Sequence, residues 1–448
     1  MMRTYPIPAR SVRKLFTNYC ARRKDIEPTG VSGLSNASSA WGVGKTRWPA
    51  SRPATIWRLA ASMQRVTYAQ CLIPGRALDA FQADAGNIKV FSEIIEREEE
   101  GTLILAPANR VASRRVLFVN SYGGRSAWER IKQGVMPAHH LWGCVELVKL
   151  GYEVAIAEPL RHFYLCRRPF PHDLRLLRLA RTWLRPGDII YSGHTLLYWL
   201  PLLKKLGALK CHLVSLTYAR EDLDFSRVHS GIIALTPAAA DKARKIAPKA
   251  RIAHLSWGVD LAFFPSLPYR PSWFLACGRT RRDHRTVCTA ATRSGAPLRV
   301  ICPTLPAELA WPENAVLFTG GRTDDTVSYQ ELLHQYYLHC SGSLIVLQND
   351  AGEKTAVGFT NLIEAMAMGR PVIVTKTGAL PGELDVEKAG CGLFVPPDDP
   401  EALANAMEEI SVDPARAAAM GASGRALVER RFNIVRYAED LHKLFESL

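Results

Sequence analysis

Short apolar runs alternate with longer amphipathic stretches from residue 114 onward. The first two runs, 116–119 and 152–157, each have the length of one buried strand. Between them lies a glycine-bearing loop followed by a helical pattern over 141–150, which Gly151 ends. A strand, loop, helix and strand in this order are typical of a parallel, doubly wound sheet. Further strands of this series are predicted at 188–191, 213–216 and 231–235.

A second series of the same kind begins after a proline-rich stretch at 264–271. Its predicted strands lie at 273–276, 298–301, 316–318, 344–347 and 371–375. Its predicted helices include 328–340 and 361–368, and three more close the chain at 399–411, 414–430 and 435–447. Two such series predict an α/β protein with two Rossmann-like doubly wound domains. Ligands of these sheets bind at the carboxyl ends of the strands, which would face one another across a cleft.

The same pattern sets the expected domain boundaries. We expect Rossmann-like domains over 111–262 and 263–432, and a C-terminal helix over 433–448 that packs back on the first domain. Residues 1–110 are interpreted as a basic N-terminal extension. Its first part, 1–78, is predicted to be mobile, because it is rich in Arg, Ser, Pro and Gly and has little periodicity. This part is open to three interpretations: a contact with an anionic membrane, a targeting-like segment, or an over-extended reading frame.

Charge and composition argue against a nucleic-acid-binding, a membrane-spanning and a zinc-binding protein. Residues 1–78 hold 13 Lys and Arg residues against two acids, so they supply +11 of the formal net charge of +15. The net charge of the two predicted domains is therefore low. Because they carry no strong excess of positive charge, no nucleic-acid partner is expected. No stretch reaches the ~20 apolar residues of a membrane-spanning helix. The ten cysteines stand singly, without a C-x-x-C pair. This usage is typical of a reduced, cytoplasmic protein, with or without a peripheral membrane contact, and does not favour a zinc site.

The stretch 358–375 carries the most specific chemistry. Gly358 opens a predicted helix whose first backbone N–H groups are unpaired, an arrangement that favours a phosphate. Thr360 can add a hydroxyl donor to the same anion. Glu364 lies about one turn further, where it can accept hydrogen bonds from a ribose or sugar hydroxyl. Gly369 ends the helix, and Pro371 opens the next strand.

This stretch resembles the donor domain of the retaining glycosyltransferase family 4, which has the GT-B fold. The resemblance continues through the run 390–407, Trp257 to Asp260 and Cys277-Gly278-Arg279, and covers roughly 114–447. It implies that the second domain binds a nucleoside-diphosphate sugar and the first a carbohydrate or glycolipid acceptor. It also implies transfer of a hexose to an acceptor hydroxyl with retention of configuration, as in polysaccharide or glycoconjugate biosynthesis.

The resemblance assigns roles to particular residues. The implied nucleotide-sugar ligands are Gly134, Arg279, Gly358, Phe359, Thr360, Asn361 and Glu364, with a second cation from Arg282 or Arg285. Arg279 and Glu364 are the catalytic candidates. His139, His140 and Tyr218 are candidates on the acceptor side. An arginine pair that neutralises the leaving diphosphate would replace a metal ion, so neither a metal nor a cofactor is expected.

Two positions depart from the family pattern. The family signature is a Glu-x7-Glu pair in which the first carboxylate contacts the transferred sugar. Glu364 fills the second position, but Ala356 stands in the first, and Glu353 would replace it only in a remodelled loop. Thr217 and Tyr218 stand where the family often has a histidine. Two alternatives therefore stay open: a catalytically altered nucleotide-sugar binder and a sugar-nucleotide epimerase on the same fold.

A predicted helix over 173–185 places four arginines on one stripe: Arg175, Arg178, Arg181 and Arg185. A basic amphipathic helix of this kind suits the headgroups of an anionic membrane. A solvated helix face on the first domain explains the same pattern more simply.

Overall fold

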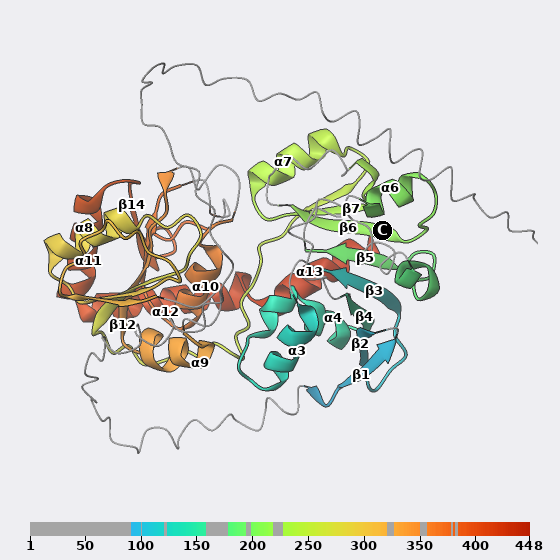
Figure 1. Ribbon diagram of the computed structural model, residues 1–448, viewed down its shortest axis with the longest axis horizontal. Coiled ribbons are helices and arrows are strands. Elements are labelled where there is room, and N and C mark those ends of the chain that lie inside the picture. The colour runs from blue at the N-terminus through green and yellow to red at the C-terminus, as the bar shows by residue number, and fades with distance from the viewer. Residues whose placement is uncertain are drawn as a thin grey trace, which may run out of the picture. The chain divides into compact units, whose positions relative to one another are not determined.

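The computed structural model describes residues 91–99, 101–120, 123–157, 178–193, 199–217, 227–319, 327–349, 356–377, 380 and 384–448. The predicted extension 1–78 lies outside this part of the chain. The described residues form two sheets with helices around them (Figure 1). We call the part built on the first sheet the N-terminal lobe and the part built on the second sheet the C-terminal lobe.

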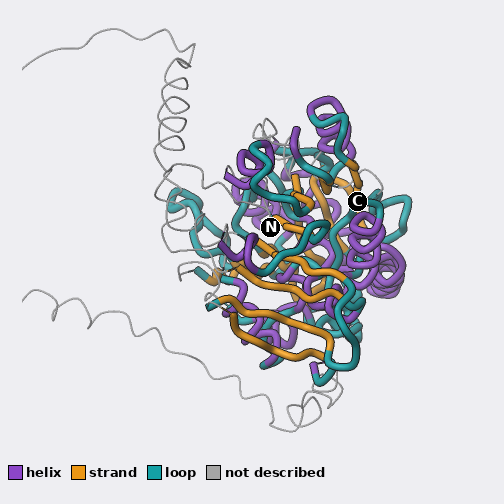
Figure 2. The backbone as a smooth tube through the Cα atoms, turned by 90° about the vertical axis from the view of Figure 1, so that its right-hand side faces the viewer, coloured by secondary structure: helices purple, strands orange, loops and turns teal. Residues whose placement is uncertain are grey.

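The N-terminal lobe is built on an eight-stranded sheet with the order β1-β2-β4-β3-β5-β6-β7-β8. Its strands lie side by side in Figure 2. Strands β3 to β8 pair in parallel, while β1 and β2 are antiparallel at one edge. The strands are β1 Ile94–Glu99, β2 Thr102–Pro107, β3 Arg114–Val119, β4 Tyr152–Ala157, β5 Ile189–Ser192, β6 His212–Thr217, β7 Gly231–Ala234 and β8 Arg251–His254.

This sheet begins earlier in the chain than the sequence predicts. Strands β1 and β2 lie within the stretch assigned to the extension, and β2 pairs with β4 through Leu103, Ile104 and Leu105. The first domain therefore starts before residue 111. Strand β1 was missed because only Ile94 of its side chains is buried, so the strand has almost no apolar signal.

The C-terminal lobe is built on a six-stranded, wholly parallel sheet with the order β11-β10-β9-β12-β13-β14. The strands are β9 Trp273–Cys277, β10 Leu298–Ile301, β11 Ala315–Phe318, β12 Cys340–Ile345, β13 Val372–Thr375 and β14 Gly392–Val395. Each predicted strand of the second series is present, although β12 begins four residues before the predicted 344–347. The fold class is therefore the predicted one, two doubly wound α/β domains.

The helices follow the same two series. Those of the N-terminal lobe are α3 Gly124–Lys132, η2 Ala138–Leu141, α4 Cys144–Lys149, α6 Trp199–Lys205 and α7 Pro237–Ile246. Those that follow in the chain are α8 His284–Ser294, α9 Tyr329–Glu331, η4 Leu332–Tyr337, α10 Phe359–Ala367, α11 Pro400–Val412, α12 Pro414–Arg431 and α13 Ile434–Glu446. Among the described helices, none is long and apolar enough to cross a membrane.

Two of the predicted helices are divided in the structure. The helix expected over 141–150 is a short 3₁₀ turn, η2, followed by α4. Trp142 and Gly143, both with positive φ, separate the two. The helix expected over 328–340 starts as one α-turn and continues as the π-helix η4. Ser328 and Glu331 close a reciprocal capping box at its start, which fixes where Tyr329 stands.

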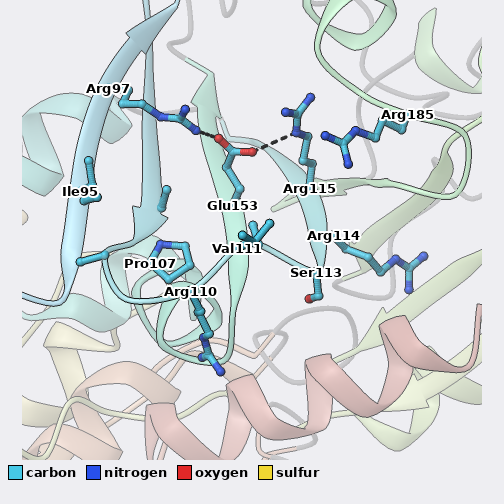
Figure 3. Close-up of a pocket in the computed structure, with 13 residues that line it drawn as sticks. Ile95, Arg97, Pro107, Arg110, Val111, Ser113, Arg114, Arg115, Glu153 and Arg185 are labelled. Carbon is cyan, nitrogen blue, oxygen red and sulfur yellow. Dashed lines mark hydrogen bonds and ion pairs between the residues drawn. The ribbon is translucent and has the colours of Figure 1, made fainter.

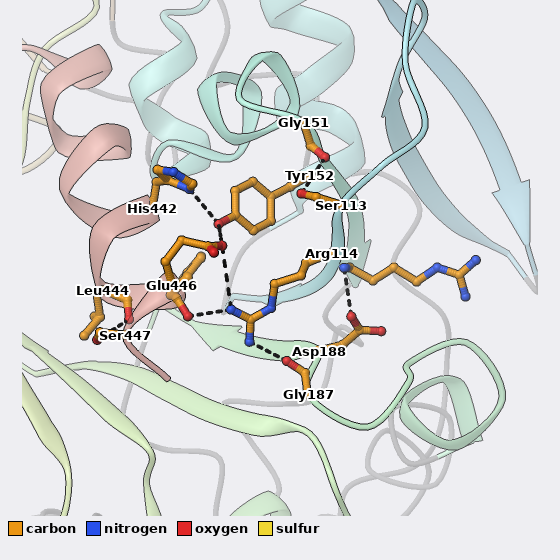
Figure 4. A network of polar contacts seen from close by, with 12 residues as sticks. Ser113, Arg114, Gly151, Tyr152, Gly187, Asp188, His442, Leu444, Glu446 and Ser447 are labelled. Carbon is orange, nitrogen blue, oxygen red and sulfur yellow. Dashed lines mark hydrogen bonds and ion pairs between the residues drawn. The ribbon is translucent and has the colours of Figure 1, made fainter.

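Helix α13 lies last in the chain and packs on the N-terminal lobe. The hydroxyl groups of Tyr191 and Tyr437 lie 2.9 Å apart, which joins β5 to α13. The hydroxyl of Tyr152 on β4 lies 2.8 Å from Nδ1 of His442 and donates to Glu446 at 3.0 Å (Figure 4). Apolar side chains of α13, including Phe445, belong to the same buried core as β3 and β4. The N-terminal lobe is therefore completed by the C-terminal helix.

The chain passes between the lobes at two places that are bonded to each other. Val259 donates its N–H to Phe432 O at 2.8 Å and accepts from the N–H of Ile434 at 3.0 Å. A Cβ on Gly258 would collide with the backbone of Asn433, so glycine is required at this close approach. The two passages therefore run together as a short two-stranded bridge.

Candidate functional site

The candidate site begins at the amino end of α10. Gly358 precedes this helix with φ 80°, and no side chain caps the helix. A Cβ at this position would lie 2.8 Å from Cγ2 of Ile345 on β12, so both the backbone angle and the space require glycine. The sequence prediction of a glycine-opened helix matches this geometry. Uncapped N–H groups at a helix start form an anion-binding end.

Arg282 lies against this helix start. Its Nη2 donates to Oδ1 of Asn361 at 2.6 Å, and its Nη1 donates to Thr280 O at 3.0 Å. Burial lowers the pKa of the Arg282 guanidinium, which nevertheless stays charged near neutral pH. Gly278, with φ 117°, leaves the space that this guanidinium occupies, because a Cβ there would collide with Arg282. A cation and a helix amino end therefore converge on one place.

The other two arginine candidates are placed differently. Arg279 is exposed in the loop after β9, and Arg285 is exposed in the first turn of α8. The sequence alone left Arg282 and Arg285 as equal choices for the second cation. Arg282 donates a hydrogen bond to Asn361 of α10, whereas Arg285 is exposed on α8, so the geometry favours Arg282. The role of Arg279 stays a prediction.

Glu364 lies in the second turn of α10 and is buried, with 1% of its surface exposed. Burial raises the pKa of its carboxyl to about 8, and a hydrogen bond from Tyr329 acts in the opposite direction. The Tyr329 hydroxyl lies 3.4 Å from Oε1, and Nε2 of His139 lies 3.5 Å from the same oxygen. Glu364 is therefore aimed at His139 of the N-terminal lobe and is largely protonated at pH 7.

His139 is buried beside Glu364 and is neutral. Its Nδ1 accepts a hydrogen bond from the N–H of Asp260 at 3.1 Å, so the ring proton belongs on Nε2, which faces Glu364. Burial lowers the pKa of His139 to about 4. The Asp260 carboxylate in turn accepts a hydrogen bond from the N–H of Ala138 at 2.8 Å. This bond holds the turn that carries His139 against the segment that contains Asp260. His139 also stacks on Phe264, with ring centroids 5.8 Å apart.

His140 reaches the same carboxyl group by another route. Its Nε2 lies 2.7 Å from the hydroxyl of Tyr329, which contacts Glu364. Both histidines predicted from the sequence are thus connected to Glu364, one directly and one through Tyr329. Gly134 stands nearby: its carbonyl accepts from Nε2 of Gln330 at 2.8 Å. These contacts join the loop before η2 to the start of α9.

The remaining candidates are placed as follows. Phe359 turns its side chain into the core, where it packs on Phe432 with ring centroids 5.7 Å apart, so only its backbone is left for a ligand. Thr360 is half-buried in the first turn of α10. Ala356, in the position of the first family glutamate, packs against the core. Tyr218 and Glu353 lie outside the described residues. Among the residues described, none of the His, Cys, Asp and Glu side chains form a group of three or more suited to a metal ion.

Sequence reasoning missed Tyr329 and gave Asp260 only a place in the resemblance. Tyr329 links His140 to Glu364 although 35 positions separate it from Glu364. The Ser-x-x-Glu pattern at 328–331 signals a helix start, so it could have placed Tyr329 at that start but not beside Glu364. The contact depends on how the chain folds back over α10.

Comparison with known proteins covers part of the chain in sequence and most of it in structure. Residues 289–413 match the family model for Glycosyl transferases group 1. A curated relative, D-inositol 3-phosphate glycosyltransferase of Corynebacterium jeikeium, is 38% identical over 86 residues, which are 19% of this chain. The matched part spans only 20% of that relative's length.

Solved structures match over three quarters of the chain. Sucrose-phosphate synthase of Thermosynechococcus elongatus is similar with a TM-score of 0.56 and 18% identity, covering 75% of this chain and 98% of that one. The Anabaena protein HepE in complex with UDP-glucose has a TM-score of 0.50 and 14% identity, covering 75% and 100%. At identities this low, the structural similarity shows the fold and not the function. The chain therefore has the GT-B fold, and its C-terminal lobe carries a Glycosyl transferases group 1 domain.

Proposed function

We propose that this protein is a glycosyltransferase that moves a hexose from a nucleoside-diphosphate sugar to an acceptor hydroxyl. The observation that carries the proposal is the meeting of Arg282 with the uncapped amino end of α10, in space left by Gly278. A guanidinium and helix N–H groups at one place favour a diphosphate. They also favour the charge that develops on a diphosphate leaving group, and this would supply electrostatic catalysis without a metal ion.

The buried carboxyl of Glu364 supports the same proposal. It lies along α10 from the diphosphate end, where a ribose hydroxyl would donate a hydrogen bond to it. Tyr329 holds this carboxyl at 3.4 Å in the structure, and a ribose hydroxyl would share or replace that donor. The similar HepE structure is a complex with UDP-glucose, and the curated relative is named a D-inositol 3-phosphate glycosyltransferase. Retention and a carbohydrate or glycolipid acceptor rest on the family resemblance.

Two other functions fit the same site. An altered nucleotide-sugar binder is favoured by Ala356, because no carboxylate stands where the family contacts the transferred sugar. A sugar-nucleotide epimerase would use the same donor pocket without an acceptor. Donor binding is common to all three, so turnover has to separate them.

The first test is a thermal-shift screen of the full chain. Uridine, guanosine and adenosine diphosphates and their sugars are compared, and one nucleotide series is expected to raise the unfolding temperature. Incubation of that sugar nucleotide with an acceptor panel should then release free nucleoside diphosphate together with a glycosylated product. Stabilisation without turnover favours the altered binder, an isomerised sugar nucleotide favours the epimerase, and the absence of any shift contradicts the donor site.

A further inference from the structure

A second group of charged side chains lies at the edge of the first sheet where its parallel strands begin, opposite the edge where these strands end. Strands β3 and β4 begin here, with Arg115 and Glu153 near their starts, and the antiparallel β2 ends here at Pro107. Because β3, β4 and β5 run parallel, this edge is opposite to their carboxyl ends. It is therefore not the edge at which the sugar nucleotide is expected.

A pocket of about 550 Å³ opens at this edge (Figure 3). Its volume lies within the range of small-molecule sites. Five arginines and one carboxylate are the charged residues that line it: Arg97, Arg110, Arg114, Arg115, Arg185 and Glu153. We call this the arginine pocket.

Glu153 neutralises only part of this charge. The carboxylate is buried and is shared by two arginines: one oxygen pairs with Arg97, and the other accepts from Nε of Arg115 at 2.9 Å. Figure 3 shows the guanidinium of Arg185 on the far side of Arg115 from Glu153. Burial, and next the charge of Arg185, lower the pKa of Arg115, as expected for cations held close together.

The neighbouring Asp188 fixes the two arginines by their backbones. Its Oδ1 accepts from the N–H of Arg115 at 3.1 Å, and its Oδ2 accepts from the N–H of Arg185 at 2.6 Å. It raises the pKa of Arg115, as does Glu99. The Asp188 carboxylate thus holds the start of β3 and the turn before β5 together, and the Arg185 side chain remains exposed.

The other two arginines donate hydrogen bonds to neutral carbonyl groups. Arg110 donates to Lys149 O, and Arg114 donates to the carbonyls of Gly187 and Phe445. A carbonyl satisfies a hydrogen bond but does not cancel a charge. Glu446 lies 3.9 Å from Arg114 and is itself largely exposed (Figure 4). The pocket therefore keeps an excess of positive charge.

We propose that the arginine pocket binds a phosphate-bearing anion through Arg97, Arg115 and Arg185. Planar guanidinium groups from three segments match the several oxygens of a phosphate better than a single surface cation does. The same chemistry occurs in a free phosphorylated metabolite and in a phospholipid headgroup. Val111 is 95% exposed in the lining, and Ile95 is 45% exposed, which gives the lipid source a specific test.

The first arm of the test uses inorganic pyrophosphate and calorimetry on the full chain. All proteins carry Arg282→Gln, so that the candidate donor site contributes little. Arg185→Gln is expected to weaken pyrophosphate binding roughly tenfold, which is the worth of a hydrogen bond to a charged group. The matched control is Arg251→Gln, an exposed arginine at the start of β8 outside the pocket, which should leave the affinity unchanged. Equal unfolding temperatures show that both variants fold.

The second arm uses sedimentation with vesicles of phosphatidylserine and phosphatidylcholine in equal parts. If the anion is a lipid headgroup, Arg185→Gln and Val111→Ser both reduce vesicle binding, and Val111→Ser leaves pyrophosphate binding unchanged. If the anion is a free phosphate, only the pyrophosphate arm responds to Arg185→Gln. The proposal is overturned if Arg185→Gln binds pyrophosphate and vesicles as strongly as Arg251→Gln does. This outcome does not depend on the result at the donor site.

Discussion

Oε1 of Glu364 lies 3.5 Å from Nε2 of His139, and both side chains are buried. Burial acts on the two groups in opposite directions: it raises the pKa of the carboxyl to about 8 and lowers that of the imidazole to about 4. Between these values both groups are neutral. A neutral pair can exchange a hydrogen bond at this distance without separating charge in a dry environment, which would cost several kcal/mol.

The raised pKa of Glu364 predicts a pH dependence of stability. The folded protein holds the Glu364 proton more tightly than the unfolded chain does, where the ordinary pKa is 4.5. This contribution is therefore complete below about pH 4.5 and is lost as the pH rises through about 8. The free energy of unfolding should fall over this window by roughly 4 kcal/mol more in the wild type than in Glu364→Gln.

Chemical denaturation at several pH values checks this expectation. His139 contributes with the opposite sign, because its pKa is lowered: its stability is present above about pH 6.5 and is lost as the pH falls through about 4. Burial raises the pKa of Glu146 to about 7, so this carboxyl also titrates between pH 6.5 and 8. Because Glu146 is present in both proteins, the difference between the wild type and Glu364→Gln in this interval isolates Glu364. Parallel stability curves for the wild type and Glu364→Gln in that interval would contradict the assigned pKa shift.

The second prediction concerns nucleotide affinity. If Glu364 holds the ribose, Glu364→Ala weakens binding of the nucleoside diphosphate by ~1–3 kcal/mol, because a hydrogen bond to a charged or buried group is lost. Glu408→Ala is the control, since Glu408 is an exposed helix carboxylate on α11. Calorimetry that finds equal affinity for the two variants refutes the ribose assignment.

A third prediction separates the two arginines that the sequence left equal. Arg282→Gln should weaken diphosphate binding roughly tenfold, because Arg282 lies at the start of α10 and its charge is lost. Arg285→Gln, on the exposed first turn of α8, should have little effect. A larger effect at Arg285 than at Arg282 would show that the loop after β9 rearranges when the ligand binds.

The fourth prediction concerns residues 1–78, which carry most of the net positive charge. We expect the chain without them to unfold as cooperatively as the full chain, because they were predicted to have little periodic structure. Calorimetric melting of both proteins makes the comparison. A broad, non-cooperative transition in the shortened chain would mean that this segment stabilises the folded lobes.

Most strands that are buried on both faces were predicted from the sequence, although β2, TLILAP, is buried and apolar and was assigned to the extension. The central strand β4 is buried at every position and mostly apolar, and it was predicted at its observed position. The edge strand β1 was missed because five of its six side chains are exposed and four of them are charged. The edge strand β8 was missed because it has only four residues, of which two are polar. Edge strands must therefore be inferred from pairing, which no single sequence displays.

The site was predictable only as far as local backbone geometry allowed. Gly358 and Glu364 belong to one helix, and their spacing was enough to place them together. The choice between Arg282 and Arg285 depends on the turn between β9 and α8, in which Gly278 and Arg281 both have positive φ. The link from His140 to Glu364 passes through Tyr329, and such a long-range contact has no signature in local spacing.

The position of α13 has a consequence for the order of assembly. Tyr437, Leu441 and Phe445 fill the core of the N-terminal lobe, yet they are synthesised after the entire C-terminal lobe. During translation the residues of the N-terminal lobe emerge first. The core of this lobe remains incomplete until the residues of α13 have left the ribosome. Apolar surface of the nascent N-terminal lobe therefore remains exposed until α13 packs against it.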